Sequence, residues 1–193
     1  MKTAILILAA GKSSRMGRPK QLLPIKHKTL LNSAIDTALA SNCSDVICVI
    51  GAYRYKIKAS IPSNSVKLLE NSNFEHGLST SIIEGVNYLE KTNCEGLLIM
   101  LADQPKISTS HLNQLLSSFE NHPSQISATA YPNSLGVPAV FPKRFFEGLK
   151  QLKGDKGAKD FLNSRYHQIV QIKHSQLFDI DTIQDYEDYL KSL

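Results

Sequence analysis

The chain has no tryptophan, three cysteines and no apolar run long enough to cross a bilayer. Its cysteines, Cys43, Cys48 and Cys94, form no Cys-x-x-Cys pair and no cluster with histidine, which argues against a disulfide framework and a structural zinc site. We expect Cys48 and Cys94 to be buried as small hydrophobic residues. The short apolar run near Met1 lacks the length and cleavage site of a signal peptide. These absences predict a single cytoplasmic domain spanning residues 1–193, with no membrane partner.

A basic run interleaved with aromatic residues is also absent, although the net charge is +5 and the isoelectric point is about 9.1. Lysine and arginine are spread along the chain, so the electrostatic pattern of a nucleic-acid-binding protein is missing. We therefore expect no nucleic-acid partner. A site for several phosphate groups on a small molecule would account for part of the positive charge.

Apolar segments of strand length alternate with segments of helical periodicity. We predict strands at residues 3–9, 45–50, 66–69, 96–101, 126–131, 137–141 and 168–173, and helices at 29–41, 78–90, 109–120, 157–163 and 182–193. Ser108 is the expected N-cap of the third helix. This order predicts a three-layer, Rossmann-like α/β fold with a mostly parallel sheet. A turn at 132–136 would join two of the strands into a small hairpin-like insertion in the second half.

A loop containing Gly11, Ser13, Arg15, Gly17 and Lys20 follows the first predicted strand. Serine stands where a dinucleotide fingerprint needs its second glycine, and the spacing of the glycines does not match a Walker A loop. What remains is a set of backbone N–H groups and cations at the carboxyl end of a buried strand, which suits a polyphosphate. Arginine can grip phosphate with two hydrogen bonds, and lysine acts as a point charge.

Two aspartates stand near the ends of predicted elements. Asp103 closes the buried strand 96–101, at the edge where open α/β sheets bind ligands. A carboxylate there can hold Mg²⁺ against nucleotide phosphates, and a turn or helix cap is the alternative. Asp181 begins the sequence Asp-Thr-Ile-Gln, and Gln184 at the fourth position makes a capping box possible for the last helix.

The stretch Leu8-Ala-Ala-Gly-Lys-Ser-Ser-Arg-Met-Gly-Arg-Pro-Lys20 resembles the signature of sugar-nucleotide-type nucleotidyltransferases, most closely the MobA-like and MocA-like proteins of the molybdenum-cofactor branch. Ala102-Asp-Gln-Pro105 looks like the Asp-x-Pro metal motif of this family in its cytidylyltransferase form. Further likenesses at 71–85, 136–141 and 152–159 extend the resemblance to the final helix. It implies a nucleotidyltransferase fold that uses Mg²⁺, with Mn²⁺ as the alternative metal.

The resemblance also implies roles for residues by position. Asp103 is implied as a metal ligand and Asp181 as a second one, since related cytidylyltransferases carry Asp-Thr-Pro-Glu-Asp there; this sequence departs from that pattern at Ile183 and Gln184. Catalysis is implied for Arg15, Lys20 and Asp103. The implied nucleotide-binding set is Leu8, Ala9, Ala10, Gly11, Ser13, Arg15, Lys20, Ser81 and Asp103. On the acceptor side it is Gly136, Pro138 and Lys156, with a solvated loop as the alternative for Lys156 and its neighbour Lys159.

The activity implied is transfer of CMP from CTP to a phosphorylated acceptor, the molybdenum cofactor (molybdopterin), with release of pyrophosphate. Guanine-selecting members tend to have more glycine where this chain has Ala9 and Ala10, which favours cytosine. Two enzymatic alternatives are guanylyl transfer and cytidylyl transfer to a phosphorylated alcohol. The alternative of another class is a non-catalytic chaperone that binds the cofactor. Transient contact with molybdoenzymes is the expected protein partnership.

Overall fold

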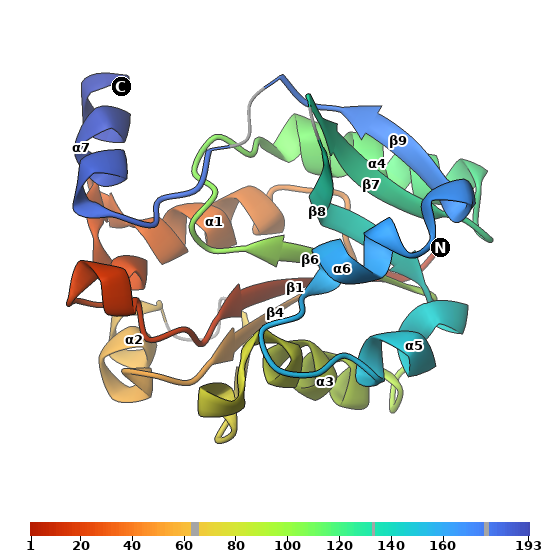
Figure 1. Cartoon of the computed structure of the whole chain (residues 1–193), viewed down its shortest axis with the longest axis horizontal. Coiled ribbons are helices and arrows are strands. Elements are labelled where there is room, and N and C mark those ends of the chain that lie inside the picture. Colours follow the sequence, from red (N-terminus) through yellow and green to blue (C-terminus); the bar gives the residue numbers. More distant parts are fainter. Residues whose placement is uncertain (63–65, 133, 176–177) are drawn as a thin grey trace.

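The computed structural model describes residues 1–62, 66–132, 134–175 and 178–193. Among these residues, seven strands form one central sheet in the order β5-β4-β1-β6-β8-β7-β9 (Figure 1). Their bounds are Thr3–Ala9 (β1), Asp45–Ile50 (β4), Lys67–Glu70 (β5), Gly96–Leu101 (β6), Ile126–Tyr131 (β7), Ser134–Pro142 (β8) and Ile169–Lys173 (β9). β8 is antiparallel to both neighbours, and the other pairs are parallel. The predicted α/β fold with a mostly parallel sheet is confirmed.

Helices cover both faces of this sheet (Figure 1). One face carries α1 (Leu30–Leu39), α2 (Arg54–Ser60) and α4 (Thr109–Asn121), and the other carries α3 (Leu78–Leu89), α5 (Phe146–Lys150) and α6 (Ala158–Asn163). Ser108 caps α4 as predicted, because its side chain accepts a hydrogen bond from the His111 N–H. Among the described residues, no helix combines the length and apolar character that crossing a membrane requires.

Strand β1 shows why the apolar run near the N-terminus forms the centre of the sheet. Its side chains alternate between two hydrophobic clusters, one on each face: Leu6 packs in the cluster of α3, and Ile7 packs in the cluster of α1. A strand buried on both faces needs a continuous apolar sequence rather than an alternating one. Cys48 of the neighbouring strand and Cys94 are buried as predicted.

The predicted hairpin is present, but it is not a separate insertion. β7 pairs with β8, and β8 also pairs with β6, so both strands belong to the central sheet. The reason is burial on both faces: Val140 packs in one cluster and Phe141 in the other. The predicted turn at 132–136 includes residue 133, which lies outside the described residues, and β8 begins already at Ser134. A separate two-stranded sheet lies in the first half, at Pro24–Ile25 (β2) and Lys28–Thr29 (β3).

The last helix, α7 (Ile183–Lys191), packs against the region around β2 rather than on the main sheet (Figure 1). A third hydrophobic cluster joins them, with Leu23 and Ile25 on one side and Ile180 and Tyr186 on the other. The Tyr186 hydroxyl donates a hydrogen bond to the Pro24 carbonyl at 2.6 Å. The C-terminal segment is therefore anchored beside the loop that follows β1.

Helix α3 crosses β1 so closely that residue 85 has no room for a side chain. A Cβ atom on Gly85 would lie 2.3 Å from Cδ2 of Leu6. We expect Gly85→Ala to lower the free energy of unfolding by about 1–3 kcal/mol, because overpacking outweighs the gain of roughly 1 kcal/mol that alanine brings to a helix. Urea denaturation measures this change, with Asn87→Ala on the exposed face of α3 as the control. A stabilised Gly85→Ala protein would contradict this close packing.

Candidate active site

The loop after β1 is turned by two residues with left-handed backbone. Ser13 has φ 53° and Gly17 has φ 63°, on either side of a 3₁₀ turn at Ser14–Met16. Glycine adopts this conformation without the Cβ penalty that other residues incur, which explains Gly17. A second 3₁₀ turn follows at Lys20–Leu22. The loop thus returns to the carboxyl end of the sheet, where open α/β folds bind ligands.

Gln21 holds this loop from inside. Its side chain is only 3% exposed, and its Nε2 donates to the carbonyls of Ala9 and Gly11, each at 2.9 Å. Its Oε1 accepts from the Ser13 hydroxyl at 3.4 Å, and that hydroxyl oxygen accepts the backbone N–H of Lys20 at 3.1 Å. One buried amide therefore fixes both ends of the loop.

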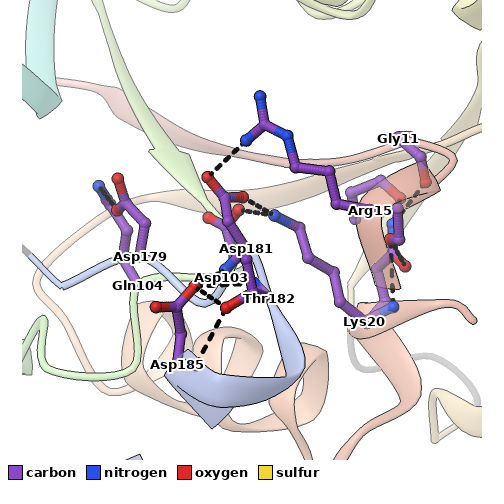
Figure 2. Close-up of polar contacts among 12 residues, drawn as sticks. Gly11, Arg15, Lys20, Asp103, Gln104, Asp179, Asp181, Thr182 and Asp185 are labelled. Carbon is purple, nitrogen blue, oxygen red and sulfur yellow. Dashed lines mark hydrogen bonds and ion pairs between the residues drawn. The ribbon is translucent and has the colours of Figure 1, made fainter. Parts of the chain in front are cut away.

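Two carboxylates from distant parts of the chain meet at Lys20 (Figure 2). Asp103 follows β6, and Asp181 precedes α7. Lys20 Nζ forms an ion pair with Asp103 Oδ2 and a second one with Asp181 Oδ1 at 2.7 Å. The side chains of Lys20 and Asp103 are 19% and 14% exposed and therefore largely shielded from water, whereas that of Asp181 is 46% exposed. At such a site each charge needs a partner, and the lysine supplies it to both acids.

Arg15 approaches the same cluster from the solvent side (Figure 2). Its Nη1 lies 3.4 Å from Asp181 Oδ2, and its side chain is 75% exposed, so this pair contributes little to stability. Burial acts to lower the pKa of Lys20, but the charge of Asp103 and the hydrogen bonds to Asp103 and Asp181 outweigh it. The pKa of Lys20 is therefore raised, and its ammonium stays charged.

The two aspartates fit a divalent cation that is shared with phosphate groups. Asp103 Oδ1 is buried and has no hydrogen-bond partner among the described residues. The described residues contain no group of three or more His, Cys, Asp or Glu side chains that could hold a metal by themselves. Mg²⁺ commonly uses one or two carboxylates and completes its shell with water and substrate phosphates. Asp103 and Asp181 suit that kind of site, whereas an all-protein cage would need more ligands.

Asp181 is not the N-cap of α7, which was the alternative to a metal-ligand role that the sequence left open. Thr182 is the N-cap of α7, and Asp185 rather than Gln184 closes the capping box. The Asp185 carboxylate accepts the backbone N–H groups of Asp181 and Thr182 at 3.1 and 2.7 Å. The helix begins one residue later than predicted because threonine and aspartate form the reciprocal pair. The Asp181 side chain is left to pair with the two cations.

A pocket of about 380 Å³ lies between this cluster and the start of α3. The predicted nucleotide-binding residues that line it are Leu8, Ala9, Ala10, Gly11, Lys20, Ser81 and Asp103. Ser13 and Arg15 are not among its lining residues. Ser13 is withdrawn because its hydroxyl is engaged by Gln21 and Lys20, and Arg15 extends into solvent toward Asp181.

A second pocket, of about 260 Å³, adjoins the first. The residues that line both are Leu8, Leu78, Leu101 and Asp155. Of the predicted acceptor-binding residues, only Gly136 lines this second pocket. Pro138 is inside β8, where its carbonyl accepts a hydrogen bond from the Thr129 hydroxyl. Lys156 is exposed, and its backbone N–H donates to the Lys153 carbonyl in a turn. Lys159 is the lysine that lines the pocket instead.

The border between the pockets is set by a close backbone contact. Gly77 has φ 101°, and a Cβ there would lie 2.2 Å from the carbonyl carbon of Gly154. The Ser79 N–H donates to the Gly154 carbonyl at 3.1 Å. This contact fixes the loop that carries Asp155 against the start of α3, so the two pockets meet at a defined wall.

Three polar residues at this site were not predicted from the sequence. Gln21 and Gln104 are buried polar side chains, and Asp179 lies beside Gln104, whose Nε2 donates to its Oδ1 at 2.9 Å (Figure 2). Burial raises the pKa of Asp179. The alternation Asp179-Ile180-Asp181 was an available signal, because a buried isoleucine in extended chain places both aspartates on the opposite side. No local pattern marks Gln21, whose partners are backbone carbonyls.

Replacing Gln21 tests whether it holds the loop. Gln21→Met keeps the length of the side chain but removes both donors. We expect the free energy of unfolding to fall by about 1–3 kcal/mol, because the buried carbonyl of Ala9 and the partly buried carbonyl of Gly11 lose their partner. Hydrogen exchange of residues 9–20 should also become faster. The exposed Gln151→Met is the control, and unchanged exchange in the loop would show that another contact holds it.

Comparison with known proteins agrees with this geometry. Residues 5–170 match the MobA-like NTP transferase domain. The chain is 32% identical over 196 residues to purine catabolism protein PucB of Bacillus subtilis, covering 94% of this chain and 93% of that protein. It is 32% identical over 170 residues to nicotine blue oxidoreductase of Paenarthrobacter nicotinovorans, covering 83% and 81%. Its fold matches Rv0371c of Mycobacterium tuberculosis in complex with manganese, with a TM-score of 0.86, 24% identity and complete coverage of both chains. The chain belongs to the MobA-like NTP transferase family and is a nucleotidyltransferase.

Proposed function

We propose that this nucleotidyltransferase transfers CMP from CTP to a phosphorylated acceptor, the molybdenum cofactor, and releases pyrophosphate. The observation that carries the proposal is the pair of adjoining pockets beside one charged cluster. The larger pocket is bordered by Lys20 and Asp103, and the smaller one opens from it past Asp155. Two substrates bound side by side would meet next to Asp103.

The donor side is assigned from the charges. Lys20 and Arg15 hold the triphosphate, with the loop around Gly11 offering backbone N–H groups. The hydroxyl of Ser81 accepts from Asn71 Nδ2 at 2.9 Å, which leaves its own hydrogen free for the sugar or base. Cations placed beside the leaving pyrophosphate stabilise the charge that grows there, so they act more on the transition state than on the ground state.

Asp103 and Asp181 would hold a divalent cation. The unpartnered Oδ1 of Asp103 supports this assignment, and so does the manganese complex formed by a protein of the same fold. When bound, the metal supplies positive charge that offsets the negative charge on the phosphates. Mg²⁺ is the metal we propose, with Mn²⁺ as its substitute.

The acceptor's own phosphate provides the nucleophile. One of its oxygens bonds to the α-phosphorus of CTP as the bond to the pyrophosphate oxygen breaks, so no nucleophilic side chain is needed. Rate acceleration then comes from positioning and charge stabilisation. Gly136 and Lys159 border the second pocket, where the body of the acceptor would lie.

One relative is named an oxidoreductase, so a redox function is an alternative to nucleotidyl transfer. The cluster of Lys20, Asp103 and Asp181 favours nucleotidyl transfer, because a cationic side chain beside two carboxylates suits a site shared by a divalent cation and phosphate groups. Three more functions compete with cytidylyl transfer to the molybdenum cofactor: guanylyl transfer, cytidylyl transfer to a phosphorylated alcohol, and cofactor binding by a non-catalytic chaperone. A substrate panel separates all of them.

In that panel, purified protein is incubated with Mg²⁺, molybdopterin and each of four NTPs, and pyrophosphate release is recorded. We expect release with CTP that exceeds release with GTP by about tenfold or more, which corresponds to roughly 1.4 kcal/mol of base discrimination. A preference for GTP would overturn the cytidylyl assignment. Pyrophosphate release that requires a phosphorylated alcohol in place of molybdopterin would refute the molybdenum cofactor as the acceptor. No release with any NTP would favour the chaperone, and oxidation of NADPH in a parallel assay would favour the redox function.

Asp103→Ala tests the metal assignment. We expect turnover with CTP to fall by roughly 10³-fold or more, because loss of the carboxylate removes the anchor for charge stabilisation at the phosphates. The fold should persist, since Lys20 keeps Asp181 as a partner, and circular dichroism checks this. Asp188→Ala, an exposed change on α7, is the control. Turnover near the normal level in Asp103→Ala would refute the role of Asp103.

A further inference from the structure

Lys20 occupies the place between the two carboxylates that a divalent cation would need. We propose that Lys20 is the resident counter-ion of Asp103 and Asp181, and that it exchanges them for the triphosphate when a divalent cation takes the carboxylates. One side chain thereby couples metal binding to nucleotide binding. The inference rests on the proposed function for the identity of both ligands, and it assigns to Lys20 a role beyond holding phosphate.

Lys20 and a divalent cation would compete for the same two carboxylates. Lys20 Nζ contacts Oδ2 of Asp103 and Oδ1 of Asp181, and these two groups are the carboxylates that fit a metal. A metal bound to both would lie close to the ammonium, and the two like charges would meet beside Asp103, where the site is largely shielded from water. Repulsion between charges grows as the local dielectric falls, so the two cations exclude each other.

Lys20 can leave the two carboxylates while the loop stays in place. Its backbone N–H is held by the Ser13 hydroxyl at 3.1 Å, and the neighbouring Gln21 amide fixes the loop. Only the four-carbon stem needs to rotate, and that stem is flexible. Lys20 and Gly11 border the same pocket, so the ammonium reaches the phosphate side without leaving the site.

The ion pairs of Lys20 also disfavour a nucleotide that arrives without a metal. A triphosphate that arrives alone must break two ion pairs to recruit Lys20 and would leave Asp103 without a cation. Leaving a shielded carboxylate unpaired is costly, so the metal-free nucleotide binds poorly. Since coupling between ligands is reciprocal, the nucleotide also favours the metal.

Lys20→Met separates this exchange from simple phosphate binding, because it changes two affinities in opposite directions. With Mn²⁺ alone, followed by the electron paramagnetic resonance signal of free Mn²⁺, we expect binding about tenfold tighter, since the competitor is gone. With inorganic tripolyphosphate in EDTA, measured by calorimetry, we expect binding about tenfold weaker. Lys12→Met is the matched control, because Lys12 borders the same pocket but pairs with Glu75 instead of the aspartates. Its effect on Mn²⁺ should stay below about twofold, which accounts for the loss of one charge at a distance.

Unchanged or weaker Mn²⁺ binding in Lys20→Met would overturn the inference, as would an equal gain in Lys12→Met. Transfer from CTP by the unaltered protein would still stand in that case. Failure of the unaltered protein to bind Mn²⁺ and to use any NTP would instead refute the proposed function and the inference with it.

A footprint on the unaltered protein covers the case in which Lys20→Met fails to fold. Reductive methylation followed by mass spectrometry reports how accessible each lysine amine is. We expect labelling of Lys20 to rise at least about threefold when Mg²⁺ is added, and to fall again when CTP is added with Mg²⁺. Labelling of Lys12 should not rise with the metal. Labelling of Lys20 that falls or stays constant with Mg²⁺ would refute the exchange.

Discussion

The ammonium of Lys20 joins three parts of the chain that are far apart in sequence. It bonds to Asp103 at the end of β6 and to Asp181 just before α7, while its own backbone belongs to the loop after β1. The cation between the two carboxylates offsets their mutual repulsion, and it does so most strongly for Asp103, the more shielded of the two. The ion pairs of Lys20 therefore fix the loop, the sheet edge and the C-terminal segment relative to one another. Lys20 and Asp103 also form part of the wall of the larger pocket.

The centre of the fold was predictable from sequence, because strands buried on both faces leave long apolar runs. Residues 3–9, 45–50 and 96–101 are such runs, and they form the three central parallel strands. Helices α2 and α5 were not predicted from the sequence. The hairpin of β7 and β8 was recognised as a pair, but its place in the sheet depends on the contact with β6, which no local pattern records.

The parts of the candidate site that could be predicted are the charged residues of recognisable motifs. Lys20 and Asp103 were expected at the carboxyl edge of the sheet, and they lie together there. Ser13 was expected beside the nucleotide, but its hydroxyl is engaged by Gln21, which sequence patterns cannot reveal because the partner is fixed only by folding. Lys156 was expected at the acceptor, yet the turn it occupies exposes it and brings Lys159 to the pocket.

The segment 178–181 lies beyond the residues that match the family domain, yet it serves both sides of the site. Ile180 is fully buried, and its N–H donates to the Asp103 carbonyl at 3.0 Å, which fixes the segment against the end of β6. Asp179 and Asp181 lie on the same side of the extended chain, opposite Ile180. Asp181 joins the cluster of Lys20, whereas Asp179 accepts a hydrogen bond from Gln104 (Figure 2) and lines the second pocket. The shared domain supplies the loop and Asp103, whereas this short segment completes the carboxylate pair and a wall of the neighbouring pocket. The positions of both aspartates therefore depend on the packing of α7. Tyr186 bonds to Pro24 after the segment, and Phe178 packs against the same hydrophobic cluster at its start.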